Sequence, residues 1–133
     1  MTIAIDASAL VEILARTDLP RRRAILDAVG DDPHWVVPEH FLLEVTNSLR
    51  GLWLGRKVTT EEFHLLIQDL AQYRFDVWPT DPLLPRIVEL APNATSYDAA
   101  YLALAEELDC RLVTADAKLA QVPGIRCRVD VAA

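Results

Sequence analysis

Short apolar runs alternate along this chain with longer segments in which apolar residues recur every three or four positions. A run without polar alternation, such as Ile3-Ala4-Ile5, is typical of a strand buried on both faces of a sheet, and the longer spacing is typical of helices. We predict strands at 3–5, 34–37, 75–78, 111–114 and 126–129, with the last one at an edge.

The predicted helices lie between these strands, and most have recognisable ends. Ser8 and Ser96 are predicted to cap two of them, and Pro38 is predicted to open the longest one. Thr59 and Glu62 have the spacing of a capping box. The predicted helices cover 8–15, 20–29, 38–54, 60–70, 87–90 and 97–108. This alternation predicts an α/β fold, a three-layer α/β/α sandwich with a mainly parallel central sheet, and the length suits one domain, 1–133.

The distribution of apolar residues around the predicted helices indicates how these helices pack. Leu42 and Tyr97 belong to apolar stripes that we predict to face the core. The helices at 38–54 and 60–70 also carry more apolar side chains than one core stripe requires. These additional residues, which predict an interface, are Leu43, Trp53, Leu54 and Leu65.

Composition narrows the class of protein. Hydrophobic residues make up 52% of the chain, which argues against disorder, and no apolar run is long enough to cross a membrane. The first apolar run lacks a basic segment before it, so it reads as a strand and not as a signal peptide. Cys110 and Cys127 do not have a metal-binding spacing and are expected to be reduced thiols in a cytoplasmic protein. The three histidines, His34, His40 and His64, are scattered, which argues against zinc.

The net charge of −7 argues against broad electrostatic wrapping of nucleic acid, although it permits a local basic patch. Such a patch would come from basic residues on the helices at 20–29 and 38–54 and just beyond the latter. The candidates are Arg21, Arg22, Arg23, Arg50, Arg56 and Lys57. A run such as Arg21–Arg23 is more often a solvated helix surface.

Four acidic residues are placed to meet at one edge of the predicted sheet. Asp6 and Asp116 follow strands, Asp98 opens a helix, and Glu44 lies in the first two turns of the helix after the second strand. Parallel strands end at a shared edge, and ligands of open α/β sheets bind there. Asp76, Glu106, Glu107 and Asp109 are predicted to lie outside this group.

Each acid has an ordinary structural explanation when it is taken alone. Asp6 suits a turn after a strand, Asp98 suits a helix N-terminus, Asp116 suits a turn or cap, and Glu44 suits a solvated helix face. Taken together, four neighbouring carboxylates would repel one another unless a cation lay between them. Oxygen ligands without nearby histidine or cysteine ligands favour Mg²⁺ or Mn²⁺, whose usual chemistry is hydrolysis at phosphorus.

Four motifs in this order resemble the PIN-domain ribonucleases, and more narrowly the VapC-type toxins of toxin–antitoxin pairs. They are Ile5-Asp6-Ala7-Ser8-Ala9-Leu10, Glu44-Val45-Thr46-Asn47-Ser48-Leu49, Ser96-Tyr97-Asp98-Ala99-Ala100-Tyr101-Leu102-Ala103-Leu104-Ala105 and Leu112-Val113-Thr114-Ala115-Asp116-Ala117-Lys118-Leu119. The resemblance implies a metal-dependent endoribonuclease that uses Mg²⁺ or Mn²⁺, forms a homodimer and is blocked by a cognate antitoxin. It implies that Asp6, Glu44, Asp98 and Asp116 are the catalytic, metal-binding acids, supported by the hydroxyls of Ser8 and Thr114.

Three other readings start from the same acids. A receiver-like Mg²⁺-binding domain would have paired acids after the first strand and a phosphoacceptor after a central strand, and Asp6-Ala7-Ser8 has no such pair. A phosphatase with an Asp-x-Asp start would have Asp where Ser8 stands. A non-catalytic PIN-like binding module would be favoured by a missing acid, and none of the four is missing.

Overall fold

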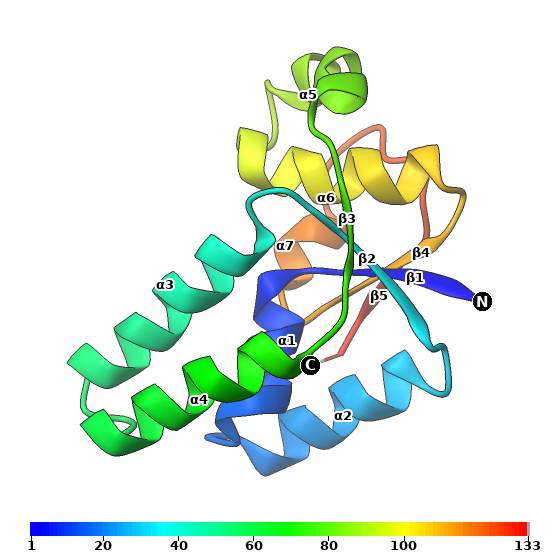
Figure 1. Ribbon diagram of the computed structural model, residues 1–133. Coiled ribbons are helices and arrows are strands. Elements are labelled where there is room, and N and C mark those ends of the chain that lie inside the picture. The colour runs from blue at the N-terminus through cyan, green and yellow to red at the C-terminus, as the bar shows by residue number, and fades with distance from the viewer. Residues whose placement is uncertain (133) are drawn as a thin grey trace.

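The computed structural model describes residues 1–132 and contains one five-stranded sheet with helices on both faces (Figure 1). In chain order the elements are β1 (Thr2–Ile5), α1 (Ala7–Ala15), α2 (Leu19–Val29), β2 (His34–Pro38), α3 (Phe41–Leu54), α4 (Thr60–Gln72), β3 (Asp76–Trp78), a 3-10 turn (Asp81–Leu83), α5 (Leu84–Leu90), α6 (Ser96–Glu107), β4 (Arg111–Thr114), α7 (Ala117–Ala120) and β5 (Val129–Val131). The predicted α/β class is confirmed.

All strands of the sheet are parallel, and their spatial order is β3-β2-β1-β4-β5. β1 is therefore central, with Ala4 opposite Val36 of β2 and Leu112 of β4. Helices α1 to α4 lie on one side of the sheet, and α5 and α6 lie on the other (Figure 1). This arrangement brings the ends of β1 and β4 to the same edge, which we call the carboxyl edge.

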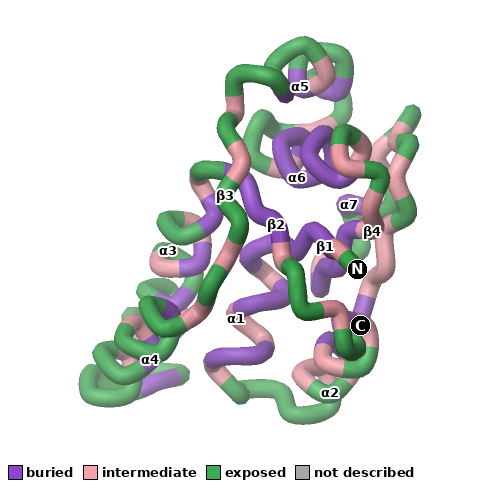
Figure 2. The backbone as a smooth tube through the Cα atoms, turned by 45° about the vertical axis from the view of Figure 1, so that its right-hand side comes forward, coloured by how far each residue is buried: buried purple, intermediate pink, exposed green. Residues whose placement is uncertain are grey.

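The hydrophobic core extends from the central strands of the sheet into helix α6, which packs on the sheet. Ile3, Ala4 and Ile5 are fully buried, as expected for an apolar run in the middle of a parallel sheet. Helix α6 is buried on most of its surface, and Figure 2 shows it enclosed between the sheet and α5. Its small residues, among them Ala99 and Ala103, let it approach the sheet closely, and it contacts β1, β2 and β4.

Several helix ends follow the sequence signals. Gly30 and Gly55 follow the last residues of α2 and α3, and Gly30 has a positive φ of 62° that a glycine adopts without strain. Thr59 and Glu62 form the predicted capping box, with each side chain accepting the backbone N–H of the other residue at 3.0–3.1 Å. The C-terminal ends of α2 and α3 and the N-terminal end of α4 are thus confirmed.

Other local predictions are wrong. Pro38 does not open a helix: it completes β2 opposite Trp78 of β3, and α3 begins only at Phe41. A proline favours an extended residue before it, and this extends the strand. The caps of α1 and α6 are Asp6 and Thr95, one or two residues earlier than the serines, which already lie within the helices.

Two predictions of burial are also wrong, and one strand is displaced. Leu42 is 44% exposed and Tyr97 is 65% exposed, so both face outward from their helices. The last strand runs from Val129 to Val131 at the sheet edge, later than predicted. Among residues 1–132, no helix combines the length and apolarity that crossing a bilayer requires.

Candidate active site

Asp6 lies at the centre of the carboxyl edge, directly after β1. Its backbone N–H continues the ladder to Val113 of β4 at 3.2 Å, and its side chain caps α1 by accepting the N–H of Ala9 at 3.0 Å. The residue is only 4% exposed. The extended strand and the first turn of the helix together hold a carboxylate in the interior, where a charge is costly unless it is compensated.

Two hydroxyl groups connect this carboxylate to the end of β4. Ser8 donates to Asp6 Oδ1 at 2.7 Å, and Thr114 donates to Asp6 Oδ2 at 2.5 Å. Each hydroxyl also accepts a backbone N–H from the loop that follows β4. Ser8 accepts from Ala115 at 3.0 Å, and Thr114 accepts from Asp116 at 2.9 Å. Both oxygens of Asp6 are therefore fixed, and each hydroxyl uses its hydrogen on the same carboxylate.

Burial raises the pKa of Asp6 to about 6, even though these hydrogen bonds act in the opposite direction. The negative charge of Glu44 adds to the rise. The hydrogen bonds from Thr114, Ser8 and Ala9 stabilise the charged form only partly. Asp6 is thus a carboxylate whose charge the protein itself leaves under-compensated.

The other three predicted acids lie in the same electrostatic neighbourhood. Asp98 is in the first turn of α6, and its pKa is raised by burial and by the charges of Glu44 and Asp116. Glu44 is in the first turn of α3, where its Oε2 lies 3.2 Å from Nε2 of His40. Asp116 caps α7 by accepting the N–H of Lys118 at 2.9 Å.

No lysine or arginine neutralises this group of acids within residues 1–132. Asp6, Asp98 and Asp116 form no ion pair there, and Glu44 has only His40. In the same residues, no three acidic, histidine or cysteine side chains are gathered tightly enough to form a preassembled metal cage. An open group of carboxylates still suits Mg²⁺ or Mn²⁺, because Mg²⁺ keeps several waters and needs only one or two protein carboxylates. The oxygen-only chemistry of the acids fits such an ion.

Three aromatic residues beside the acids were not predicted as part of the site. His40 packs against Tyr97 and Tyr101, with ring centroids 5.4 and 5.0 Å apart, and it lies one helical turn before Glu44. The spacing of His40 and Glu44, four residues apart at the start of a helix, is a signal that the sequence does contain. A groove of about 530 Å³ opens here, lined by His40, Leu43, Glu44, Asn47, Thr95, Tyr97 and Asp98.

The arginine run predicted as a possible RNA contact has structural partners. Arg21 donates to the carbonyl of Ala115 at 2.5 Å, Arg22 donates to the carbonyl of Ile13 at 2.9 Å, and Arg23 pairs with Asp27. Arg50, in contrast, is exposed on α3 and makes no ion pair within residues 1–132. It continues the helix face that Leu43 and Asn47 present to the groove.

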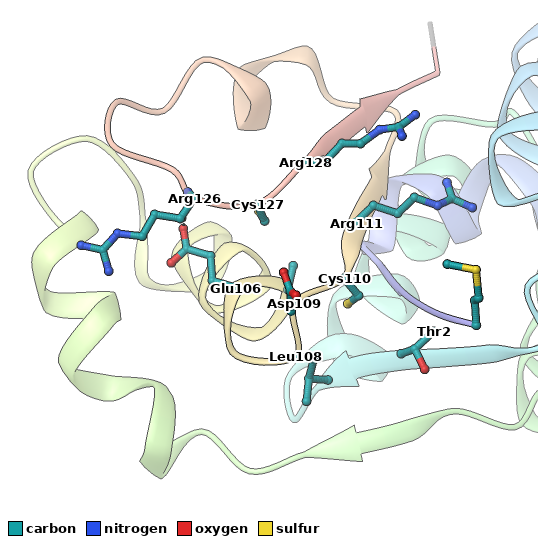
Figure 3. A pocket seen from close by; sticks show the side chains of 11 residues that line it. Thr2, Glu106, Leu108, Asp109, Cys110, Arg111, Arg126, Cys127 and Arg128 are labelled. Carbon is teal, nitrogen blue, oxygen red and sulfur yellow. Dashed lines mark hydrogen bonds between the residues drawn. The ribbon is translucent and has the colours of Figure 1, made fainter.

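A second hollow, of about 380 Å³, lies at the opposite edge of the sheet, where β1 and β4 begin (Figure 3). Its lining includes Arg111 and both free thiols, Cys110 and Cys127. Burial raises the pKa of Cys127 to about 11, so this group stays a protonated thiol at neutral pH. The predicted state of the two cysteines, reduced and half-buried, agrees with this environment.

Comparison with known proteins places the chain in a family. The model of the PIN domain matches residues 3–125. Ribonuclease VapC12 of Mycobacterium tuberculosis is 31% identical over 132 residues, which cover 98% of this chain and 99% of the relative. Ribonuclease VapC1 of the same organism is 30% identical over 131 residues, covering 96% and 95%.

Solved structures share the fold at lower identity. Mycobacterium tuberculosis VapC20, described as a Sarcin-Ricin loop cleaving toxin, superposes with a TM-score of 0.68 at 16% identity, covering 95% of this chain and 98% of that one. FitAcB from Neisseria gonorrhoeae gives a TM-score of 0.70 at 16% identity, covering 96% and 95%. The full-length matches and the parallel sheet agree, and the chain belongs to the PIN-domain family and, within it, to the VapC-type ribonuclease toxins of toxin–antitoxin systems.

Proposed function

We propose that this ribonuclease cleaves RNA at the carboxyl edge of its sheet, with Asp6, Glu44, Asp98 and Asp116 as the acids that hold Mg²⁺ or Mn²⁺. The observation that carries the proposal is Asp6. It is buried, its charge is under-compensated, the charge of Glu44 acts on it, and it forms no ion pair within residues 1–132. A bound divalent cation supplies the missing positive charge, makes a water molecule more acidic and offsets charge on a leaving oxygen.

The residues of the chain divide the work of the site. Asp6 is immobilised by Ser8, Thr114 and the N–H of Ala9, so it offers a fixed carboxylate. Asp98 and Glu44 enter from the first turns of two helices, and their charges act on one another. One of these less constrained carboxylates orients the attacking water for in-line displacement at phosphorus. Hydrogen bonds such as those of Ser8 and Thr114 to Asp6 fix the orientation of ligands in metal sites.

The groove beside the acids suits single-stranded or looped RNA. Unpaired bases stack on aromatic side chains, and Tyr97 presents an exposed ring at the groove backed by His40. Arg50 lies further along α3, beyond Asn47, and is placed to contact a backbone phosphate. The net charge of −7 makes these local contacts more important than general electrostatic attraction.

A cognate antitoxin is the proposed protein partner of the same site. An arginine or lysine of the antitoxin would pair with the unneutralised carboxylates, as a charge-assisted hydrogen bond permits. It would thereby occupy the place of the cation and close the groove. Solved relatives described as toxin–antitoxin complexes, such as the one from Klebsiella pneumoniae, support this proposal.

A homodimer is proposed from the apolar surface of α3 and α4. Leu43, Leu54 and Leu65 are 77%, 55% and 51% exposed, respectively, and Trp53 is partly exposed. Exposed apolar side chains that cluster on adjacent helices mark an interface. Sedimentation velocity at micromolar concentration is expected to give a dimer, and a single monomeric species would contradict this.

The function is tested by RNA cleavage with purified protein in Mg²⁺ or Mn²⁺, with and without a chelator. Asp6→Asn and Asp98→Asn are each expected to lower the cleavage rate about 100-fold or more, because each removes a charged ligand while conserving size. Glu107→Gln removes an exposed charge elsewhere on α6 and is expected to leave the rate unchanged. Cleavage that persists in chelator or in both aspartate variants would falsify the mechanism, and absence of cleavage by wild type would favour a binding module.

A further inference from the structure

Among residues 1–132, four buried side-chain polar atoms have no hydrogen-bond partner, and two of them belong to residues beside the acids. They are the hydroxyl oxygen of Tyr101 and Nε2 of His40. Tyr101 is on α6, one turn after Asp98, and it is only 1% exposed. His40 precedes α3, and its Nε2 is 3.2 Å from Glu44 Oε2 without the alignment of a hydrogen bond.

The charges of three of the acids act on the hydroxyl of Tyr101. The ring packs edge-on against His40 at 5.0 Å. Burial raises the pKa of Tyr101 far above its ordinary value, and the charges of Glu44, Asp6 and Asp98 raise it further, with Glu44 the strongest of the three. The amide of Ala7 approaches the phenol oxygen, but the phenol hydrogen finds no acceptor among residues 1–132.

An unsatisfied hydroxyl in the core is costly, and the cost is avoidable. Phenylalanine would fill the same volume without burying a polar atom, so packing gives no reason for a tyrosine. His40 raises the same question, since its ring contacts need no free nitrogen. A group left unpaired inside a native protein calls for an explanation, and here two of them flank Glu44.

We propose that Tyr101 and His40 are positioning residues that together orient Glu44 when the acidic site is loaded. In the proposed arrangement the carboxylate of Glu44 turns toward Asp6 and accepts the phenol hydrogen of Tyr101 on one oxygen. His40, with its hydrogen on Nε2, donates to the other oxygen. The inference rests on the proposed function, because Glu44 would hold the divalent cation in that position.

The test uses Mn²⁺ alone as the probe and needs no RNA. In isothermal titration, Tyr101→Phe is expected to weaken Mn²⁺ binding about threefold to tenfold, the effect of one hydrogen bond to a ligand. The same change is expected to raise the melting temperature of the cation-free protein by about 2–4 °C, since it removes an orphan hydroxyl. Residues that serve only packing would not move the two readouts in opposite directions.

Two further comparisons separate positioning from structure. In a Glu44→Gln background, Tyr101→Phe is expected to have little additional effect on Mn²⁺ affinity, because its partner is already altered. His40→Phe should weaken Mn²⁺ binding while His40→Gln, which keeps a donor, should restore part of it. Tyr73→Phe is the matched control, since Tyr73 packs against Trp35 and Phe75 and does not line the groove.

The outcomes of these experiments distinguish failure of the positioning role from failure of the proposed function. If wild type binds Mn²⁺, Asp6→Asn does not, and Tyr101→Phe binds as wild type does, the positioning role is overturned while the proposed function stands. Independent, multiplying effects of Tyr101→Phe and Glu44→Gln would also overturn it. A wild-type protein that binds no Mn²⁺ would overturn both the positioning role and the proposed function.

Discussion

The two edges of the sheet treat acidic side chains in opposite ways. At the edge where β1 and β4 begin, which we call the amino edge, Arg111 pairs with Asp32 at 2.8 Å and with Asp130 at 3.0 Å. It also donates to the carbonyls of Ala28 and Val29. At the carboxyl edge, Asp6, Asp98 and Asp116 have no basic partner within the described residues. Figure 3 shows Arg111 on the first of these edges.

The two edges differ in how their charged residues affect the stability of the fold. A satisfied ion-pair network joins α2, β4 and β5 and contributes to the stability of the fold. An acidic group without counter-charge does the reverse, because its members repel one another and are partly desolvated. Perturbed carboxylates of this kind cluster at functional sites, which supports the proposal that this edge holds the cation.

The largest expected effect concerns Asp116, which is both a helix cap and a proposed ligand. Asp116→Asn keeps the capping oxygen for the N–H of Lys118, since asparagine caps as well as aspartate does. It removes the charge, so RNA cleavage is expected to fall about 100-fold while the melting temperature stays within about 2 °C. Full cleavage by the variant would reduce Asp116 to a cap.

A change at the amino edge should have the opposite profile. Arg111→Met leaves Asp32 without its partner and Asp130 with only the exposed Arg128, and it is expected to lower the free energy of unfolding by about 2–3 kcal/mol in urea denaturation. Mn²⁺ affinity should not change. Arg126→Met, at an exposed arginine 4.0 Å from Glu89, is the control and should alter neither quantity. Loss of Mn²⁺ binding in Arg111→Met would mean that the two edges are coupled.

The pH dependence of stability sharpens the comparison further. The pKa of Asp6 is about 6 in the folded protein, above its ordinary value of 3.8. Its contribution to stability is therefore complete below pH 3.8 and is lost as the pH rises through 6. Between pH 5.0 and 7.5, without cations, this loss is expected to be about 1 kcal/mol by urea denaturation.

Two variants identify the group responsible for this pH effect. Asp6→Asn is expected to remove the loss, because the residue no longer titrates, whereas Glu107→Gln is expected to keep it. At pH 7.5, saturating Mn²⁺ should raise the free energy of unfolding of the wild-type protein again, since the ion binds only the folded state. A wild-type protein that becomes more stable than Asp6→Asn as the pH rises would contradict the under-compensated state of Asp6.

The smallest effect is expected along the groove. Arg50→Ala should raise KM for RNA about threefold to tenfold, leave kcat unchanged and reduce the salt dependence of binding by about one counterion. Arg23→Ala removes an exposed arginine that already pairs with Asp27, and it should change neither KM nor the salt dependence. Equal effects of the two variants would mean that RNA responds to overall charge and not to the groove.

The sequence by itself determined the order of elements and the edge of the sheet at which the acids lie. The apolar run at Ile3–Ile5 requires a doubly buried strand, and alternation with helices requires a parallel sheet. Parallel strands all end on one side, so Asp6 and Asp116 share an edge whatever the details of packing. Hydrophobic periodicity and helix capping involve residues that are close in sequence, so they can be predicted from the sequence alone.

What the sequence could not decide is how side chains from distant segments meet. The hydrogen bonds of Thr114 and Ser8 to Asp6, the burial of Tyr101 and the outward turn of Tyr97 depend on where α6 and β4 pack against β1. The position of His40 between two tyrosines has the same origin. Burial and hydrogen-bond partners are properties of the assembled layers, because they depend on which surfaces face each other across the sheet. Only the tertiary structure therefore revealed that the protein neutralises the acids of one edge and leaves those of the other exposed to one another's charge.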